Sequence, residues 1–374
     1  MKLELGEQKF REQCNQTSAL VGAGLWGVLA ALAGAGRAPL GVIELLFLFA
    51  PLVVVPLGQS LAGVIAPAGS RPLEDAARTL QPLAAGLAVA SFWFSPGPRA
   101  AALAGAWALV CGLLALGGAR SLLGGRARTL REVAVSVGRL DLALAAAWLL
   151  ASRLGIHPLG IQEPIGLLTA VHFHFTGFGT ATLAAAVAAF ARRINRDPRT
   201  THLIVALVVF LPFLLAAGFV LSPILKVVAA VMLSLAVTAL GLCQLRLAPQ
   251  TNSPEAAGFL RLSSLAIVAG ATLAGVYAIG DWLGTDWLTI PRMAGTHGWL
   301  NSLGFVLPGL LGWLVEWQVR TAEEPDVNVR VCWRTPSMKL RVSVMARLRK
   351  LLPASYASGR LRHARGRARL HSQL

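Results

Sequence analysis

The chain has 374 residues, of which 55% are hydrophobic and only 14% are charged. Its mean hydropathy is +0.64, and the apolar residues come in long uninterrupted blocks, which excludes an ordinary soluble domain and indicates membrane helices. The formal net charge is +17. Because the basic residues lie in short loops and in the C-terminal tail, we interpret them as determinants of membrane topology and expect no nucleic-acid partner.

The apolar blocks predict an all-α polytopic integral membrane protein with about ten transmembrane helices, within residues 17–317. The expected spans are, in chain order, Thr17–Ala35, Leu40–Leu61, Thr79–Phe94, Ala100–Gly118, Val133–Ser152, Pro164–Phe190, His202–Leu221, Leu225–Leu245, Leu262–Trp282 and His297–Trp317. An N-terminal segment, residues 1–16, precedes them, and a polar, basic tail, residues 318–374, follows. We expect the first span to remain uncleaved.

Basic residues alternate between the loops that join these spans. The basic loops follow the second, fourth, sixth and eighth spans and contain Arg71, Arg78, Arg120, Arg126, Arg128, Arg131, Arg192, Arg193, Arg196, Arg199, Arg246 and Arg261. The opposite loops have about one basic residue each, namely Arg37, Arg99, Arg153, Lys226 and Arg292. By the positive-inside rule, both termini are predicted to lie in the cytoplasm, and the lipid partner is the bilayer of a bacterial cytoplasmic membrane.

The tail contains a stretch, Met338–Leu352, with apolar residues at Leu340, Val344, Leu348 and Leu351 and basic residues between them. This spacing predicts an amphipathic helix on the inner leaflet, where anionic lipids attract basic side chains. A solvated, positively charged tail explains the same composition equally well. The last stretch, Ala357–Leu374, is predicted to be disordered.

Polar residues gather at the predicted outer ends of several spans. His172 and His174 lie in the sixth span, His297 opens the tenth span, and Asn301 follows it at i+4 on the same helix face. Glu44 lies near the outer start of the second span. These five residues are the candidates for binding a ligand or a metal. The supporting candidates are Thr169, Thr176, Thr296, Tyr277 and Asp281.

Two positions along an ideal helix rotate a side chain by about 200°. His172 and His174 therefore cannot bind one ion together unless the helix is locally broken, for which Gly177 and Gly179 give an opportunity. On a regular helix we expect the two rings to have separate partners.

The sequence leaves three interpretations of these residues open. Histidines from the sixth and tenth spans, with help from Glu44, can bind a metal or a haem, because neutral imidazole is a common metal ligand. Alternatively, a histidine and Glu44 carry protons in a transporter of a small substrate. In the third interpretation the histidines only hydrogen-bond neighbouring helices, in a structural or assembly role.

Other charged residues receive structural interpretations. Arg139 and Asp141 are placed near the inner end of the fifth span, where Arg139 can extend to the membrane surface, and their i, i+2 spacing keeps them from facing each other. The chain has no phosphate-binding loop, dinucleotide fingerprint, zinc-protease motif or nucleophile elbow. The sequence therefore does not decide whether the protein is an enzyme, and it does not identify a small-molecule ligand or a cofactor.

Two segments are similar to each other and to a known family. His174-Phe-Thr-Gly177-Phe178 is similar to Asn301-Ser-Leu-Gly304-Phe305. The longer segments Leu168–Phe178 and Thr296–Phe305, with His-Phe-His in the first and Thr-His-Gly-x-x-Asn in the second, resemble the YndJ-like family of bacterial integral membrane proteins. The resemblance implies a multi-pass membrane fold up to about Trp317 and supports this choice of residues. It implies no particular activity.

Overall fold

The structure is a computed structural model that describes residues 2–66, 71–196, 198–285 and 287–323. All regular elements in these ranges are helices. They are α1 (Lys2–Gly34), α2 (Val42–Phe49), η1 (Ala50–Val54), α3 (Val55–Ile65), α4 (Arg71–Ser91), α5 (Pro98–Leu123), α6 (Leu130–Leu154), η2 (Pro158–Gly160), α7 (Ile165–His172), η3 (Phe173–Thr180), α8 (Ala181–Arg193), α9 (Pro198–Leu221), α10 (Pro223–Leu247), η4 (Ala248–Gln250), α11 (Pro254–Trp282), α12 (Ile290–Met293), η5 (Ala294–Gly298), η6 (Leu300–Val306) and α13 (Leu307–Glu323). The fold is all-α, and the predicted tail helix at 338–352 lies outside the described residues.

Nine stretches of the described chain are long and apolar enough to cross a membrane. They are Arg11–Gly34, Val42–Ile65, Pro98–Leu123, Leu130–Leu154, Ile165–Arg193, Arg199–Leu221, Pro223–Gln250, Pro254–Trp282 and Ile290–Val319. They correspond to nine of the ten predicted spans, so the protein is a polytopic all-α membrane protein. The first of them belongs to α1, a continuous helix that begins at Lys2.

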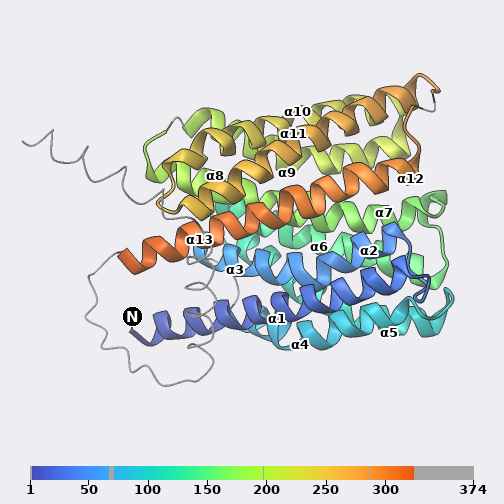
Figure 1. Ribbon diagram of the computed structural model, residues 1–374, viewed down its shortest axis with the longest axis horizontal. Coiled ribbons are helices and arrows are strands. Elements are labelled where there is room, and N and C mark those ends of the chain that lie inside the picture. The colour runs from blue at the N-terminus through green and yellow to red at the C-terminus, as the bar shows by residue number, and fades with distance from the viewer. Residues whose placement is uncertain (1, 67–70, 197, 286, 324–374) are drawn as a thin grey trace, which may run out of the picture. The chain divides into compact units, whose positions relative to one another are not determined.

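The remaining predicted span, Thr79–Phe94, falls largely on α4. This helix packs along α5 (Figure 1), and its 21 residues extend for about 32 Å, which is enough to traverse the hydrocarbon core. It is less apolar than the other spans because Glu74, Asp75 and Gln81 lie on it and contact neighbouring helices. With α4 counted as a traverse, α1 begins and α13 ends at the same end of the helices, as Figure 1 shows.

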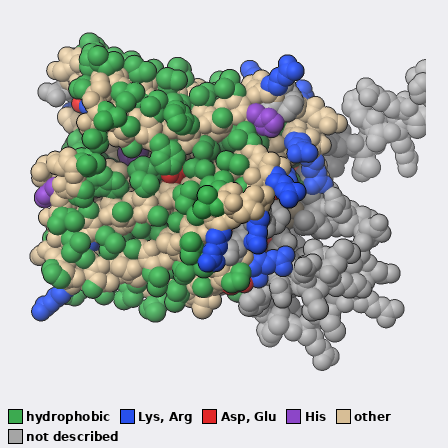
Figure 2. All heavy atoms as spheres, turned by 180° about the vertical axis from the view of Figure 1, so that it is seen from behind, with side chains coloured by type: hydrophobic (Ala, Val, Ile, Leu, Met, Phe, Trp, Pro, Cys, Tyr) green, Lys and Arg blue, Asp and Glu red, His purple; other side chains and the backbone are tan. Residues whose placement is uncertain are grey.

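Positive charge gathers at that same end. Figure 2 shows Lys and Arg side chains clustered there, whereas few lie at the opposite end. The exposed basic residues include Arg71, Arg120, Arg126, Arg192, Arg196, Arg246 and Arg261. This distribution agrees with the predicted loop pattern. We call this end inner and the opposite end outer, in accordance with the predicted topology.

Glycine allows close helix packing in several places. A Cβ atom added to Gly118 of α5 would lie 2.5 Å from the carbonyl oxygen of Ser136 in α6. Small residues of this kind let helix backbones approach in lipid, where no hydrophobic force drives helices together. The α5–α6 pair is accordingly one of the most extensive helix contacts in the fold.

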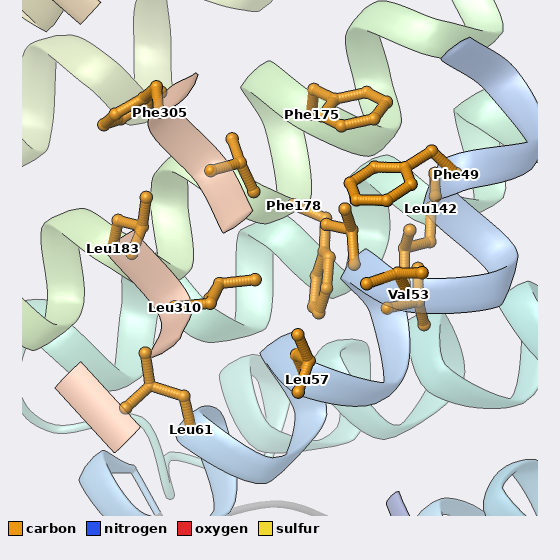
Figure 3. Close-up of a cluster of buried hydrophobic side chains, with 14 of the residues drawn as sticks. Phe49, Val53, Leu57, Leu61, Leu142, Phe175, Phe178, Leu183, Phe305 and Leu310 are labelled. Carbon is orange, nitrogen blue, oxygen red and sulfur yellow. The ribbon is translucent and has the colours of Figure 1, made fainter. Parts of the chain in front are cut away.

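The centre of the helical domain is formed by three spans that are interrupted by π-helical segments: α2–η1–α3, α7–η3–α8 and α12–η5–η6–α13. Their apolar side chains form a common core with α6, and Figure 3 shows residues such as Val53, Phe178 and Leu310 in it. The buried share of the most apolar 18-residue window differs between spans. It is 78% in α2–η1–α3 and 89% in α7–η3–α8, against 17% in the first span of the chain.

The π-helical segment η3 contacts both η1 and η6. Each lies near the middle of its span. The two similar segments found in the sequence, His174–Phe178 and Asn301–Phe305, lie within η3 and η6. The shared Gly-Phe pair therefore marks the same type of backbone interruption in two spans.

Side chains satisfy backbone carbonyl groups in and around these interruptions. Gln81 of α4 donates to Pro51 O in η1 at 2.7 Å, and Ser263 of α11 donates to Phe305 O in η6 at 2.9 Å. In η3, the Thr180 hydroxyl donates to Phe175 O at 3.1 Å. Irregular backbone is tolerated at membrane depth only when such groups are satisfied within the protein, so these hydrogen bonds help to stabilise the π-helical segments.

Candidate functional site

His174 is a buried link between two spans. Its side chain lies in η3 and is 0% exposed. Its Nδ1 atom lies 2.8 Å from Ala170 O and its Nε2 atom lies 3.1 Å from Nε1 of Trp107 in α5. A carbonyl oxygen only accepts, so Nδ1 carries the proton and Nε2 accepts from the indole. Both ring nitrogens are therefore used.

His297 links the last span to α11 in a similar way. Its Nδ1 atom donates to Gly270 O at 2.8 Å, so its Nε2 atom accepts from the Asn301 amide nitrogen at 2.9 Å. This orientation leaves Asn301 Oδ1 buried and without a hydrogen-bond partner among the described residues. The oxygen lies against α11 at Gly270, where an added Cβ atom would collide with it.

His172 differs from the other two histidines because the residue is exposed on the helix surface. Its Nδ1 atom donates to Leu168 O at 2.7 Å, which leaves Nε2 as an acceptor. No described residue is hydrogen-bonded to that nitrogen. The ring stacks on His297, with centroids 6.4 Å apart and planes inclined by 24°. The structure thus brings His172, His297 and Asn301 together, while His174 faces other helices.

These residues do not fit a metal or haem site. A histidine ligand must offer an unprotonated ring nitrogen, and among the three only His172 has one that is not already hydrogen-bonded. Within the part of the chain that the structure describes, no three His, Cys, Asp or Glu side chains are grouped closely enough to hold a metal ion. We therefore derive no chemistry through a metal or haem.

The remaining candidate residues lie apart from the stacked rings of His172 and His297. Glu44 Oε2 accepts from Gly41 N at 2.9 Å and so caps α2. Asp281 pairs with Lys226 of α10 at 2.7 Å, and Tyr277 follows Gly270 by seven residues, about 10 Å along α11. Thr169 and Thr296 donate to carbonyl groups of their own helices, and Thr176 lies within η3.

An open cavity of about 460 Å³ lies between α1, α2 and the last span. Its lining is mainly apolar and includes Trp26, Leu45 and Trp299. It contains none of the polar candidates, so it adds no polar ligand group to the site.

The structure also shows a polar cluster that the sequence analysis did not assign to a site. Arg139 was expected to extend to the membrane surface, but it is 2% exposed and its Nη1 atom lies 2.7 Å from Glu74 Oε1. Its Nη2 atom donates to Gln59 Oε1 at 3.1 Å. The expectation was wrong because its partner lies on α4, in a stretch interpreted as a loop. A charged residue within a long apolar span was the available signal.

Asp141 is the second residue that sequence reasoning missed. The helix α6 begins at Leu130, so Asp141 lies near the middle of the helix and not near the inner end. The residue is 2% exposed, and its Oδ1 atom is without a hydrogen-bond partner among the described residues. As the spacing predicts, Asp141 and Arg139 face different neighbours.

The fold and these residues define a multi-pass, all-α membrane protein with ionisable side chains inside its helical region. The sequence profile of the YndJ-like protein family matches residues 45–305, more than half of the chain. The chain therefore belongs to the YndJ-like family. The two histidine segments that suggested this resemblance lie within the matched range.

One curated relative is the uncharacterized membrane protein YndJ of Bacillus subtilis (strain 168), which is 30% identical over 189 residues. The aligned region covers 50% of this chain and 33% of that relative. The chain thus spans about a third of the relative's length in the alignment. No solved structure matches the chain.

Proposed function

We propose that this protein is a proton-coupled transporter of a small polar solute, and that its moving part is the set of three spans with π-helical segments. The observation that carries the proposal is that η3 contacts both η1 and η6 near the middle of those spans. Such segments are rare and occur frequently at functional sites. Transporters bind their substrates and ions where spans are discontinuous.

His172 supplies the outer proton acceptor in this proposal. Its Nε2 atom has an unused lone pair, and its ring lies next to His297 at the outer end of the interrupted spans. A proton on His172 Nε2 places a positive charge beside the neutral ring of His297, which is hydrogen-bonded to Gly270 O of α11. Protonation therefore changes the interaction between η3 and the last span.

We further propose that the protein lies in a bacterial cytoplasmic membrane with both termini in the cytoplasm, and that its tail binds anionic lipids. The gathering of basic residues at one end of the helices supports this orientation (Figure 2). Protease treatment of sealed spheroplasts tests it. The tail should remain intact until the membrane is permeabilised, and cleavage of the tail in intact spheroplasts would contradict the orientation.

Reconstitution tests the transport activity directly. The purified protein is placed in phosphatidylethanolamine–phosphatidylglycerol vesicles that contain a pH-sensitive dye, and sugars, amino acids, carboxylates and amines are added in turn. At least one class should change the internal pH faster than in protein-free vesicles, and His172→Gln should lower that rate to background. His202→Gln, at an exposed histidine of α9, is the matched control. Folded protein without flux for any class would overturn the proposal.

A structural or assembly role is the second candidate, and one observation favours it. All four ring nitrogens of His174 and His297 are hydrogen-bonded, as expected of residues that only hold helices together. Under this alternative, replacing His172 changes neither flux nor stability. The vesicle assay therefore separates the two functions.

A further inference from the structure

A carboxyl group lies near the middle of a transmembrane helix without a charged partner. Asp141 follows the first residue of the 25-residue helix α6 by 11 positions, which places it about 16 Å along the helix axis. It is 2% exposed and its Oδ1 atom has no hydrogen-bond partner in the described chain. An ionisable side chain at this depth is by default a candidate functional group.

The carboxyl group of Asp141 lies directly against the backbone of η3. A Cβ atom added to Gly177 would lie 2.8 Å from Asp141 Oδ2, and one added to Gly138 would lie 3.3 Å from the carbonyl oxygen of Gly177. Gly177 is thus needed for this close approach of α6 and η3, and at Gly138 an added Cβ atom would fit only if its neighbours shifted. The carboxyl group therefore faces the π-helical segment that contacts the other two.

No charged side chain of the described residues pairs with Asp141. Arg139 on the same helix is turned towards Glu74 of α4 and Gln59 of α3. The other titratable or charged side chains on α6 and on the elements packed against it are Glu132, Arg131, Arg153, Arg99, Cys111, Arg120, His172, His174, Arg192, Arg193, Arg199 and His202. None of them forms an ion pair or a hydrogen bond with the Asp141 carboxyl group.

Burial without a partner disfavours the ionised carboxylate, whereas a protonated carboxyl group is neutral and can donate a hydrogen bond. The carbonyl oxygen of Gly177 lies on the face of η3 that is turned towards α6. We propose that Asp141 is a reversible proton-binding site, and that its bound proton donates a hydrogen bond to the backbone of η3. The proton comes from water and returns to water, and no covalent bond to carbon changes. Only the role of this proton in transport depends on the proposed function.

A polar cluster that contains Arg139, Gln59 and Glu74 lies on the inner side of Asp141. Arg139 precedes Asp141 by two residues, towards the inner end of α6. The Arg139 Nε and Gln59 Nε2 atoms are buried and have no hydrogen-bond partner in the described chain. Buried polar atoms of this kind are ordinarily satisfied by ordered water, which can relay a proton. We therefore expect the proton to reach Asp141 from the inner side, and His172 to exchange protons on the outer side.

Infrared difference spectroscopy of the full-length protein in lipid nanodiscs tests the site without a substrate. A pH step should produce the C=O stretching band of a carboxylic acid in the wild type. The band should be lost in Asp141→Asn, which keeps the shape and the donor of the protonated form. Asp281→Asn is the matched control because it removes a carboxylate at the outer end of α11 and should leave the band in place.

Gly177→Ala gives a second, independent measurement. The added methyl group competes with the carboxyl group for the same space, so the frequency and the midpoint of the Asp141 band should shift. An unchanged band in Asp141→Asn would overturn the proposal. A wild-type band that persists at every pH would also overturn it, because the proton would not exchange. If the Asp141 carboxylate stays ionised because Na⁺ binds to it, the result would establish a cation site in place of a proton site.

The outcomes distinguish this inference from the proposed function. An Asp141 band that titrates, together with vesicles that show no solute-dependent flux, supports the proton site and contradicts transport. Flux that survives in Asp141→Asn, with the band absent from wild type, supports transport and contradicts the proton site. Circular dichroism of each variant shows whether the helices are retained, and Asp141→Asn, as the near-isosteric change, decides the result if Gly177→Ala does not fold.

Discussion

The outer histidines and the central carboxyl group differ in how their polar atoms are satisfied. His174 and His297 use both ring nitrogens in hydrogen bonds to other groups. The Asp141 Oδ1 atom has no such partner among the described residues. The comparison shows that a recognisable motif inside a membrane can mark helix–helix contacts, while a buried carboxyl group outside the motif can have an oxygen atom without a hydrogen-bond partner.

The largest effect should come from breaking the buried ion pair near Asp141. Glu74→Ala leaves the Arg139 guanidinium buried without its carboxylate, which typically destabilises a protein by about 3–5 kcal/mol. Because Glu74 is partly exposed, with a side chain that is 19% accessible, we expect the lower end of that range. Unfolding by SDS in mixed micelles measures the change.

A double variant shows whether the loss arises from the stranded charge. Glu74→Ala/Arg139→Met removes both charges and should recover much of the stability, since apolar replacements of buried pairs are often neutral. If the double variant is as unstable as Glu74→Ala alone, the ion pair is not the cause.

The second prediction concerns the hydrogen bond that satisfies η1. Gln81→Leu removes the donor to Pro51 O and leaves a buried carbonyl group with one partner fewer, which costs about 1–3 kcal/mol. Gln250→Leu is the matched control because the Gln250 side chain makes an exposed hydrogen bond to Arg246 O. Equal destabilisation in the same SDS assay would show that the bond to η1 has no special role.

The sequence predicted the spans well because a stretch of about 20 apolar residues has few alternatives to crossing the membrane. The prediction from sequence failed where a side chain interacts with a residue that is distant in the sequence. Glu74 belongs to a stretch interpreted as a loop, so the burial of Arg139, 65 positions later, could not be anticipated. The π-helical segments were missed for the same reason. They accept hydrogen bonds from donors such as Gln81 and Ser263 on other helices. Their local signs were Gly177 and Gly179 and the similarity of His174–Phe178 to Asn301–Phe305.

A smaller effect is expected for the link between His174 and Trp107. A double-mutant cycle with His174→Leu and Trp107→Phe should give a coupling energy of about 0.6–2 kcal/mol, the range measured for hydrogen bonds between membrane helices. The same cycle with His172→Leu in place of His174→Leu should give no coupling. Coupling between His172 and Trp107 would contradict the assignment of separate partners to the two histidines.

The smallest change in stability is expected at His172, which nevertheless should be the most reactive histidine of the site. Its exposed ring has an Nε2 lone pair that no described residue uses, so His172→Ala should alter stability by no more than about 0.5 kcal/mol. Ethoxyformylation needs such a lone pair, and in His174 and His297 the equivalent lone pair accepts a hydrogen bond.

Peptide mass spectrometry after brief treatment with diethyl pyrocarbonate at neutral pH compares the three rings within one sample. The exposed residues His157 and His202 serve as internal references for unhindered reaction. His172 should react faster than His297, and His174 should react only after unfolding. Rapid modification of His174 in the folded protein would show that its bond to Trp107 opens readily. The contrast between satisfied outer histidines and an unsatisfied central carboxyl group would then no longer hold.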